Sequence, residues 1–128
     1  MEINDLIIED LLKKAKENIR LRENLCLHES QKDKVQKMIN VLIPGTKVPI
    51  HCHLNSNETL VLLRGSIYVI YYDKQGTETK RFFLSTSKNQ LIDIKRGQWH
   101  SVFVNEPVVL FEVKEGPYRP LLEEEILK

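Results

Sequence analysis

From Val35 onward, the sequence is divided into short apolar runs that end at turn residues, and this pattern constrains the fold more than any other feature. The runs are rich in β-branched and aromatic residues, which favour extended chain, and the breaks carry glycine, proline or asparagine. Seven or more short strands at about ten-residue spacing predict an all-β fold, either a sandwich or a barrel. The expected strands lie within residues 35–43, 47–53, 59–65, 66–73, 81–85, 90–97, 99–105 and 108–116.

The sequence before this pattern predicts one helix. Apolar side chains recur at helical spacing from Ile7 onward, and Asn4 or Asp5 can cap the helix, which should end near Asn18. Residues 19–34 are expected to form extended chain or a short strand, followed by a turn.

The length of 128 residues suits one domain with one core. We expect residues 1–34, the helix and extended segment, to pack on the outside of a barrel formed by residues 35–128. The last eight residues, 121–128, are expected either to form a short helix or to fray.

Composition excludes several classes of partner. The net charge of +1 gives no electrostatic reason to expect nucleic acid or a membrane surface. No segment approaches the roughly 20 apolar residues of a membrane span, and the N-terminus lacks the features of a secretory signal. Cys26 and Cys52 form no CxxC pair and are expected to be reduced thiols. We therefore expect a cytoplasmic protein.

Two of the four histidines, His51 and His53, stand one residue apart. If this segment is a strand, both imidazoles project to one face, roughly 6–7 Å apart, and can converge on one metal ion. Glu58, across a polar turn, can add a carboxylate, and His100, after a glycine turn, is the candidate for a fourth ligand. The alternative is that these are hydrogen-bonded core histidines, which are more common than metal ligands.

The spacing of these residues resembles the first motif of the cupin superfamily, which is an antiparallel jelly-roll barrel. Gly45, His51, His53, Glu58 and Gly65 occupy each position of that motif.

The second cupin motif fits in part. Gly97 and His100 are in place, but Asn89, Lys95 and Val104 stand where the family has glycine, proline and asparagine. These departures affect turns and leave the metal-binding positions intact. The resemblance implies an all-β, single-domain cupin barrel with an N-terminal helix, in which one divalent metal ion is coordinated by four residues: His51, His53, Glu58 and His100.

A closer resemblance is to the WbuC-type cupin metalloproteins, which are often encoded with bacterial surface-polysaccharide genes. It covers about residues 20–118, with Arg-x-Arg, then asparagine and histidine before the barrel, and Phe-Glu-Val-Lys-x-Gly-Pro-Tyr near the end. If the N-terminal segment folds over the barrel mouth, its arginines can bind a carboxylate or phosphate; otherwise they form an exposed pair. The candidate pocket residues are Arg20, Arg22, Asn24, His28, Gln36 and Tyr118.

Three imidazoles and one carboxylate leave up to two open positions on an octahedral ion, which suits Fe, Mn or Ni, and Zn also fits this donor set. Three functions remain open: a metal-dependent enzyme acting on a sugar or nucleotide-sugar, a metal-assisted binding module without turnover, and a barrel with a structural metal. Isomerase, epimerase and dioxygenase reactions are all compatible with the ligand set, and no residue is assigned a catalytic role. Cupin barrels commonly pair, so a homodimer is expected by analogy.

Overall fold

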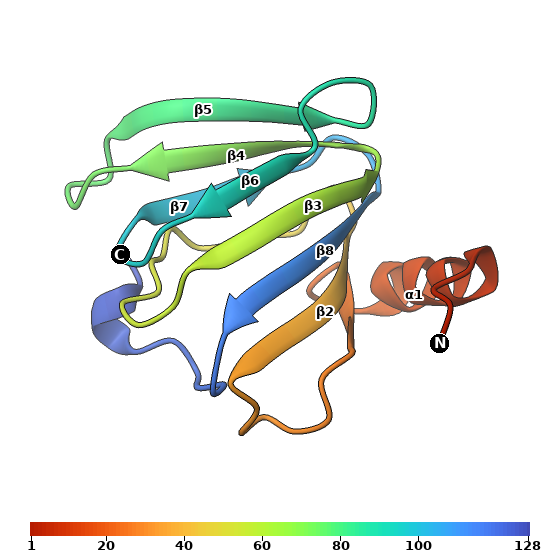
Figure 1. Cartoon of the computed structure of the whole chain (residues 1–128). Coiled ribbons are helices and arrows are strands. Elements are labelled where there is room, and N and C mark those ends of the chain that lie inside the picture. Colours follow the sequence, from red (N-terminus) through yellow and green to blue (C-terminus); the bar gives the residue numbers. More distant parts are fainter.

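Two antiparallel β-sheets face each other in the computed structural model, which describes residues 1–128 (Figure 1). One sheet has the strand order β1-β2-β8-β3-β6 and the other has the order β5-β4-β7. The strands are β1 (Arg22–Cys26), β2 (Val35–Leu42), β3 (Glu58–Arg64), β4 (Ser66–Tyr72), β5 (Glu78–Ser85), β6 (Leu91–Ile94), β7 (Trp99–Phe103) and β8 (Val108–Glu115). This arrangement is a jelly-roll barrel, as the strand pattern and the cupin resemblance predicted.

The barrel interior is filled by side chains that alternate along each strand. On β3, the inward residues Glu58, Leu60 and Leu62 are buried, and each lies opposite an inward residue of β8. The apolar core continues between the sheets as a cluster of eleven buried residues: Leu42, Leu60, Leu62, Ile67, Val69, Leu84, Ile92, Ile94, Val104, Val108 and Leu110. Polar residues follow where this cluster ends, so one end of the barrel interior is apolar and the other is polar.

Helix α1 (Asp5–Glu17) lies outside the barrel (Figure 1). Its N-cap is Asn4, whose side chain accepts a hydrogen bond from the backbone N–H of Ile7, and it ends at Asn18, so both predicted ends are confirmed. The buried residues of the helix pack against the outer face of β2 and β8 through a second apolar cluster: Ile8, Leu11, Ala15, Ile39, Val41, Ile43 and Val109. With 13 residues, α1 falls short of a membrane span, and no other helix in the structure is long or apolar enough.

Residues 47–53, predicted as a strand, do not form one. His51 makes only isolated bridges, to His100 and to Ile126. Pro49 has no N–H to donate, so a continuous ladder through this segment is interrupted. The segment instead pairs with the C-terminal tail, where Glu123–Glu125 form a short 3₁₀ helix, one of the two outcomes expected for the tail.

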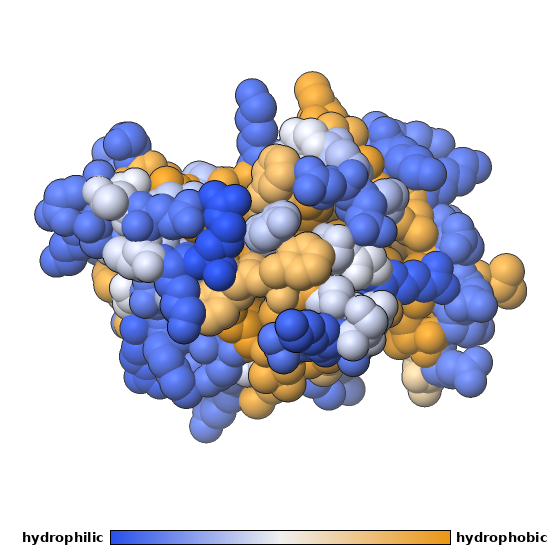
Figure 2. Space-filling view, turned by 90° about the horizontal axis from the view of Figure 1, so that it is seen from above, coloured by the Kyte–Doolittle hydropathy of each residue, from blue (hydrophilic) through white to orange (hydrophobic).

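The outer face of the smaller sheet is not covered by any element. Figure 2 shows hydrophobic side chains among hydrophilic ones on this side of the molecule, where β5 and β4 lie. Phe83 and Phe103 are half exposed there, and both lie opposite Tyr68 on β4.

Candidate metal centre

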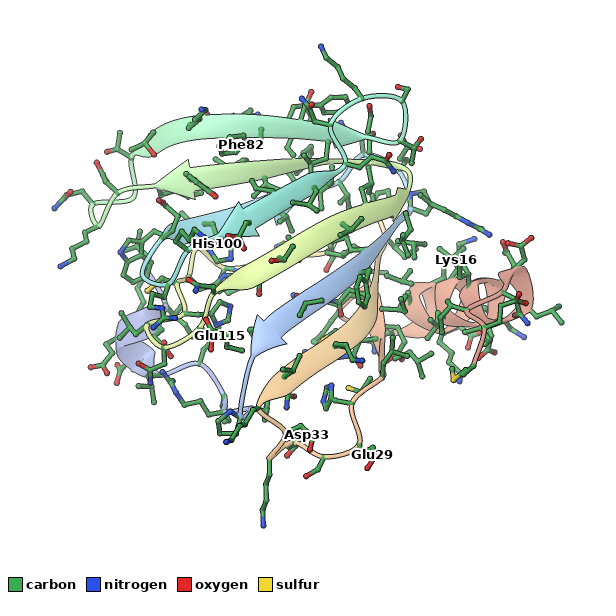
Figure 3. All side chains as sticks on the ribbon, viewed as in Figure 1. Lys16, Glu29, Asp33, Phe82, His100 and Glu115 are labelled. Atoms are coloured by element: carbon green, nitrogen blue, oxygen red, sulfur yellow. The ribbon has the colours of Figure 1, made fainter.

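Backbone pairing places the histidines of the candidate centre. The N–H of His51 donates to the carbonyl of His100 at 3.0 Å, and the N–H of His100 donates back at 2.8 Å. His100 comes from β7 and points into the space between the sheets (Figure 3). Glu58 is the first residue of β3, so its carboxylate reaches the same space from the facing sheet.

Hydrogen bonds fix the tautomer of two imidazoles. Nδ1 of His51 lies 2.8 Å from the carbonyl oxygen of Pro49, and Nδ1 of His100 lies 2.9 Å from that of Gln98. Because a carbonyl oxygen can only accept, each Nδ1 carries the proton and donates it. Nε2 of each ring therefore keeps its lone pair, which is the form in which histidine binds a metal ion.

The four predicted ligands converge. The ligand nitrogens of His51, His53 and His100 all lie within 4.8 Å of one another. The carboxylate of Glu58 lies 3.4 Å from Nε2 of His53 and 3.5 Å from Nε2 of His100. Ligand nitrogens on one ion with bonds of about 2.1 Å lie at most about 4.2 Å apart, so the cluster needs only a small contraction to hold one ion.

The electrostatics of the cluster suit a cation. Burial, followed by the neighbouring His100, lowers the pKa of His51 to about 4, so His51 is neutral at physiological pH. Burial alone would raise the pKa of Glu58, but its interactions with the neighbouring His100 and His53 outweigh burial and hold this pKa below its usual range. An ionised carboxylate beside the imidazole nitrogens gives a desolvated donor set that fits a divalent ion.

A cavity of about 570 Å³ opens beside the cluster. Four of the predicted pocket residues line it, namely Arg20, Arg22, Asn24 and Tyr118.

The other two predicted pocket residues lie outside this lining and serve the backbone. His28 accepts a hydrogen bond at Nδ1 from the N–H of Lys37, 3.1 Å away. Gln36 is buried, and its Nε2 donates to the carbonyl of Asp33 at 2.9 Å. Both side chains hold the segment between β1 and β2, because its backbone groups would otherwise lack partners.

Glu112 belongs to the site, although no motif in the sequence indicated it. It lines the cavity from β8, and its Oε1 accepts a hydrogen bond from Nδ2 of Asn40 at 3.1 Å. Burial, followed by the charge of Glu58, raises the pKa of Glu112 to about 8, so its carboxyl is protonated at neutral pH. The available signal was the alternation along β8, which puts Glu112 and Lys114 on the same face as the buried Val108 and Leu110.

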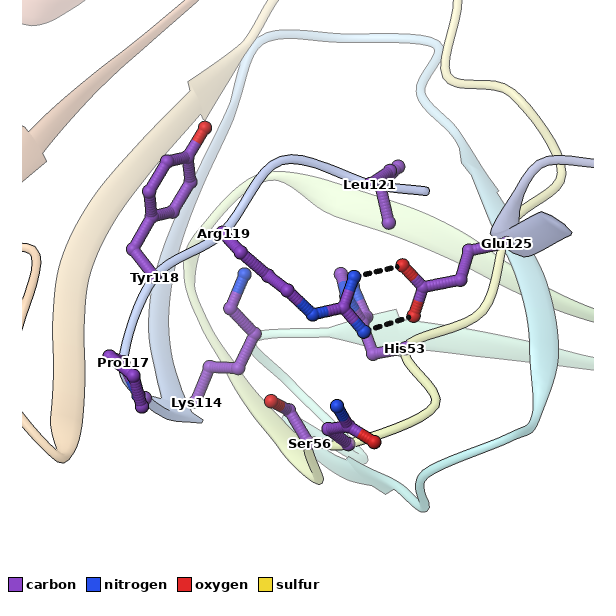
Figure 4. A pocket seen from close by; sticks show the side chains of 10 residues that line it. His53, Ser56, Lys114, Pro117, Tyr118, Arg119, Leu121 and Glu125 are labelled. Atoms are coloured by element: carbon purple, nitrogen blue, oxygen red, sulfur yellow. Dashed lines mark hydrogen bonds and ion pairs between the residues drawn. The ribbon is translucent and has the colours of Figure 1, made fainter. Parts of the chain in front are cut away.

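A second, smaller cavity of about 170 Å³ lies on the other side of the C-terminal segment (Figure 4). His53, Lys114, Tyr118 and Leu121 line both cavities, so these side chains, two of which belong to the C-terminal segment, form the wall between them.

The wall is anchored by an ion pair. Both guanidinium nitrogens of Arg119 donate to the carboxylate of Glu125, at 2.6 and 3.0 Å (Figure 4). The Glu125 side chain is only 1% exposed and also accepts from the N–H of Leu54. The hydrogen bond from Arg119 lowers the pKa of Glu125 to about 2, so this carboxylate stays ionised.

Several solved structures share the fold of this barrel. CapF with the inhibitor 3-isopropenyl-tropolone is 19% identical, with a TM-score of 0.64 over 76% of this chain. The chain spans 29% of that CapF chain, and CapF is elsewhere described as a capsular polysaccharide assembling protein from Staphylococcus aureus. A cupin superfamily protein from Desulfitobacterium hafniense is 13% identical, with a TM-score of 0.59 over 73% of this chain and 76% of the other.

Oxalate decarboxylase from Bacillus subtilis, a protein with Mn(II) centres, is 16% identical, with a TM-score of 0.57 over 70% of this chain and 24% of the other. These likenesses show that the chain has the cupin fold. No curated protein matches the sequence. A protein family described as a domain of unknown function, DUF6016, matches residues 3–84, and the chain belongs to this family. The matched region includes His51, His53 and Glu58 and ends before His100.

Proposed function

We propose that this protein is a metal-dependent enzyme that acts on a small polar substrate, a sugar or nucleotide-sugar, at the polar end of the cupin barrel. One observation carries the proposal: His51, His53, Glu58 and His100 line a cavity of about 570 Å³, and two of the rings have their lone pairs directed by backbone hydrogen bonds. A purely structural metal needs no such cavity beside it.

The proposed cofactor is one divalent ion, Fe, Mn, Ni or Zn, held by these four side chains. Such an ion supplies Lewis-acid polarisation of a substrate oxygen, or O₂ chemistry if it is redox-active. Within the chain, Glu112 holds a proton inside the cavity, and Asn40 orients the carboxyl that carries it. A group of this kind can donate a hydrogen bond or a proton to a substrate oxygen.

Two lines of support point to the substrate class. CapF, which shares the barrel, is described as a capsular polysaccharide assembling protein. The WbuC-type resemblance, whose Arg-x-Arg lies in the cavity lining, leads to the same area of metabolism. We therefore propose a role in surface-polysaccharide biosynthesis, with isomerase, epimerase and dioxygenase as the candidate reaction classes.

The test begins with metal content per chain, measured by elemental analysis on protein purified without chelator or metal-affinity resin. We expect about one equivalent in the parent and little in the double variant His51→Ala/His53→Ala. The parent should then turn over a nucleotide-sugar in a metal-dependent way, and His100→Ala should abolish turnover.

Two outcomes contradict the proposal in different ways. Absence of metal in the parent, even after reconstitution, would show that the histidines are core or substrate-binding groups. Metal and ligand binding without any product after long incubation would favour a metal-assisted sugar-binding module without turnover. The homodimer and the cytoplasmic location stay predictions, and sedimentation would test the first.

A further inference from the structure

The arginines that line the cavity differ from all the others in that they form no ion pair. Arg20 and Arg22 line the cavity, and neither forms an ion pair. Each of the remaining four binds a carboxylate at 3.1 Å or less: Arg64 with Asp5 and Glu9, Arg81 with Glu78, Arg96 with Glu115, and Arg119 with Glu125. The chain therefore pairs every arginine except the two that line the cavity.

A third cation lies deeper, beside the metal-ligand cluster. Lys114 lines the cavity from β8, directly across from Glu58 of β3, and it forms no ion pair. Its carboxylate neighbours have other partners: Glu58 faces the histidines, and Glu112 accepts a hydrogen bond from Asn40. Three cations therefore face the cavity without a partner.

The backbone that presents the two arginines is held in an unusual conformation. Leu21, which lies between them, has a φ of 56°, in the left-handed region that residues other than glycine rarely adopt. Three hydrogen bonds fix this turn: Ile43 N–H to the Leu21 carbonyl at 3.0 Å, Thr46 Oγ1 to the Arg20 carbonyl at 2.7 Å, and Arg20 N–H to Asn18 Oδ1 at 2.8 Å. Strain of this kind persists only where the surroundings enforce it, often at ligand sites.

The two guanidinium groups also repel each other. Burial, followed by the charge of Arg20, lowers the pKa of Arg22. Glu23 directly follows Arg22 in sequence, but its carboxylate accepts from the N–H of Asn24 at 3.0 Å and pairs with neither arginine. Unpaired like charges, of which that of Arg22 is partly buried, are unfavourable in the free protein, and a bound anion would relieve that repulsion.

We propose that this cavity binds an oxyanion of its ligand, a phosphate or carboxylate group, through Arg20 and Arg22, with Lys114 as a further cationic contact beside the metal-ligand cluster. The inference rests on the proposed function for the metal-dependent step and narrows its substrate to an acidic sugar, such as a sugar phosphate or a sugar acid. Arginine suits this role because its planar guanidinium matches both oxyanions in a bidentate geometry.

The experiment measures binding by isothermal titration calorimetry with three probes of similar size: D-glucose 1-phosphate, D-glucuronate and D-glucose. We expect at least one of the two anions to bind and the neutral sugar not to bind, with the difference between the anions identifying phosphate or carboxylate as the preferred group. Affinity for the bound anion should fall by at least about tenfold in Arg22→Gln, since hydrogen bonds between charged groups contribute that much.

The matched control is Arg81→Gln, which removes the same charge from an arginine paired with Glu78 outside the cavity. Its affinity should stay within about twofold of the parent, because Arg81 does not line the cavity and salt screens the charge of an exposed side chain. Arg20→Gln, at an exposed position, repeats the test if Arg22→Gln fails to fold. Equal losses in cavity variants and control, or equal binding of D-glucose, would overturn the proposal.

The anion site and the metal-dependent function fail separately. In His51→Ala/His53→Ala, which removes two metal ligands, we expect anion binding that is still weakened by Arg22→Gln. That result supports the anion site even if the parent shows no turnover. Anion binding that disappears in the double variant, with the fold intact by circular dichroism, would show that the arginines alone bind no oxyanion and would overturn the proposal.

Discussion

The two ends of this barrel are built from the same strands but filled with different chemistry. Along β8, the inward residues run from Lys114 and Glu112 to Leu110 and Val108, and along β3 they run from Glu58 to apolar residues. The polar end comprises His51, His53, Glu58, His100, Glu112 and Lys114, and the apolar end comprises Leu62, Ile67, Val69, Leu84 and Val108.

The difference concerns what each end can contribute. At the apolar end, fully buried aliphatic side chains stabilise the fold by removing apolar surface from water. At the polar end, desolvation of ionisable groups costs free energy that hydrogen bonds only offset, although no buried polar side-chain atom lacks a partner. The apolar end therefore provides most of the stability of the fold, whereas the side chains of the polar end are available to bind a ligand.

The largest effect is expected from removing a ligand at the polar end. His100→Ala should weaken metal binding by at least about 100-fold, because losing a ligand costs more than losing one of its hydrogen-bonding partners. His28→Ala is the matched control, since its ring accepts from the Lys37 backbone outside the cavity. Elemental analysis after dialysis measures both. Equal metal loss in the two variants would show that the cluster is not the binding site.

The next largest effect lies at the apolar end. Leu62 is fully buried, and Leu62→Ala should lower the free energy of unfolding by about 3 kcal/mol through lost burial and a residual cavity. The adjacent Leu63 is 40% exposed on the other face of β3, so Leu63→Ala should cost less than about 1 kcal/mol. Urea unfolding measures both. Metal content per folded chain should be unchanged in Leu62→Ala, and a loss there would show that the two ends are coupled.

A third prediction concerns pH at the polar end. The pKa of Glu112 is about 8, above its ordinary value of 4.5, so the folded chain binds this proton more tightly than the unfolded chain. The resulting stabilisation is complete below the ordinary value and is lost as pH rises through about 8. Glu112→Gln stays uncharged and keeps an acceptor for Asn40, so it should lose less stability on going to alkaline pH.

The measurement is urea unfolding of metal-free protein at about pH 5 and about pH 9. The change between these conditions should be smaller in Glu112→Gln than in the parent, by on the order of 2 kcal/mol. Glu124→Gln, at an exposed position, should follow the parent. Identical pH dependence in all three proteins would mean that Glu112 is not held protonated by its surroundings.

Much of this architecture follows from local sequence pattern. The two-residue alternation and the turn residues predicted the strands, and the spacing of apolar residues predicted α1 with its Asn4 cap, because these signals depend on neighbouring residues alone. The prediction was wrong for residues 47–53, whose partner is the distant Ile126. Residues far apart in sequence pair there, and no local pattern encodes such pairing.

The site, too, could be predicted only where its residues belong to a sequence motif. Their spacing in the sequence suggested His51, His53, Glu58 and His100 as candidates, since residues at the positions of a shared motif are expected to lie close together in the fold. The role of Glu112 depends on Asn40 from another strand and on burial between two sheets. A single glutamate within an apolar stretch of sequence does not reveal either of these contacts, so its role could not be predicted. His28 fitted the resemblance and Gln36 was a further pocket candidate, but their hydrogen bonds to the backbone appear only once the chain between β1 and β2 is folded.

The smallest effect compares two carboxylates near the polar end that have similar partners. Glu125 accepts from Arg119 and the Leu54 N–H with its side chain 1% exposed, whereas Glu115 accepts from Arg96 and the Asn57 N–H with its side chain 49% exposed. Glu125→Gln should lower the free energy of unfolding by on the order of 1 kcal/mol, because a buried hydrogen-bonded charge loses more than an exposed one. Glu115→Gln should change it by less than about 0.5 kcal/mol.

The pH dependence of this last comparison gives its sharpest test. The pKa of Glu125 is lowered to about 2, so the stabilisation from its charge is present above the ordinary value of 4.5 and is lost as pH falls from there toward about 2. The difference between the parent and Glu125→Gln, measured by urea unfolding, should therefore shrink between about pH 7 and about pH 3. If Glu115→Gln costs as much as Glu125→Gln, or if the difference does not depend on pH, then burial does not set the strength of ion pairs at the polar end. The difference between the polar and apolar ends would then be explained by the types of side chain at each end and not by their burial.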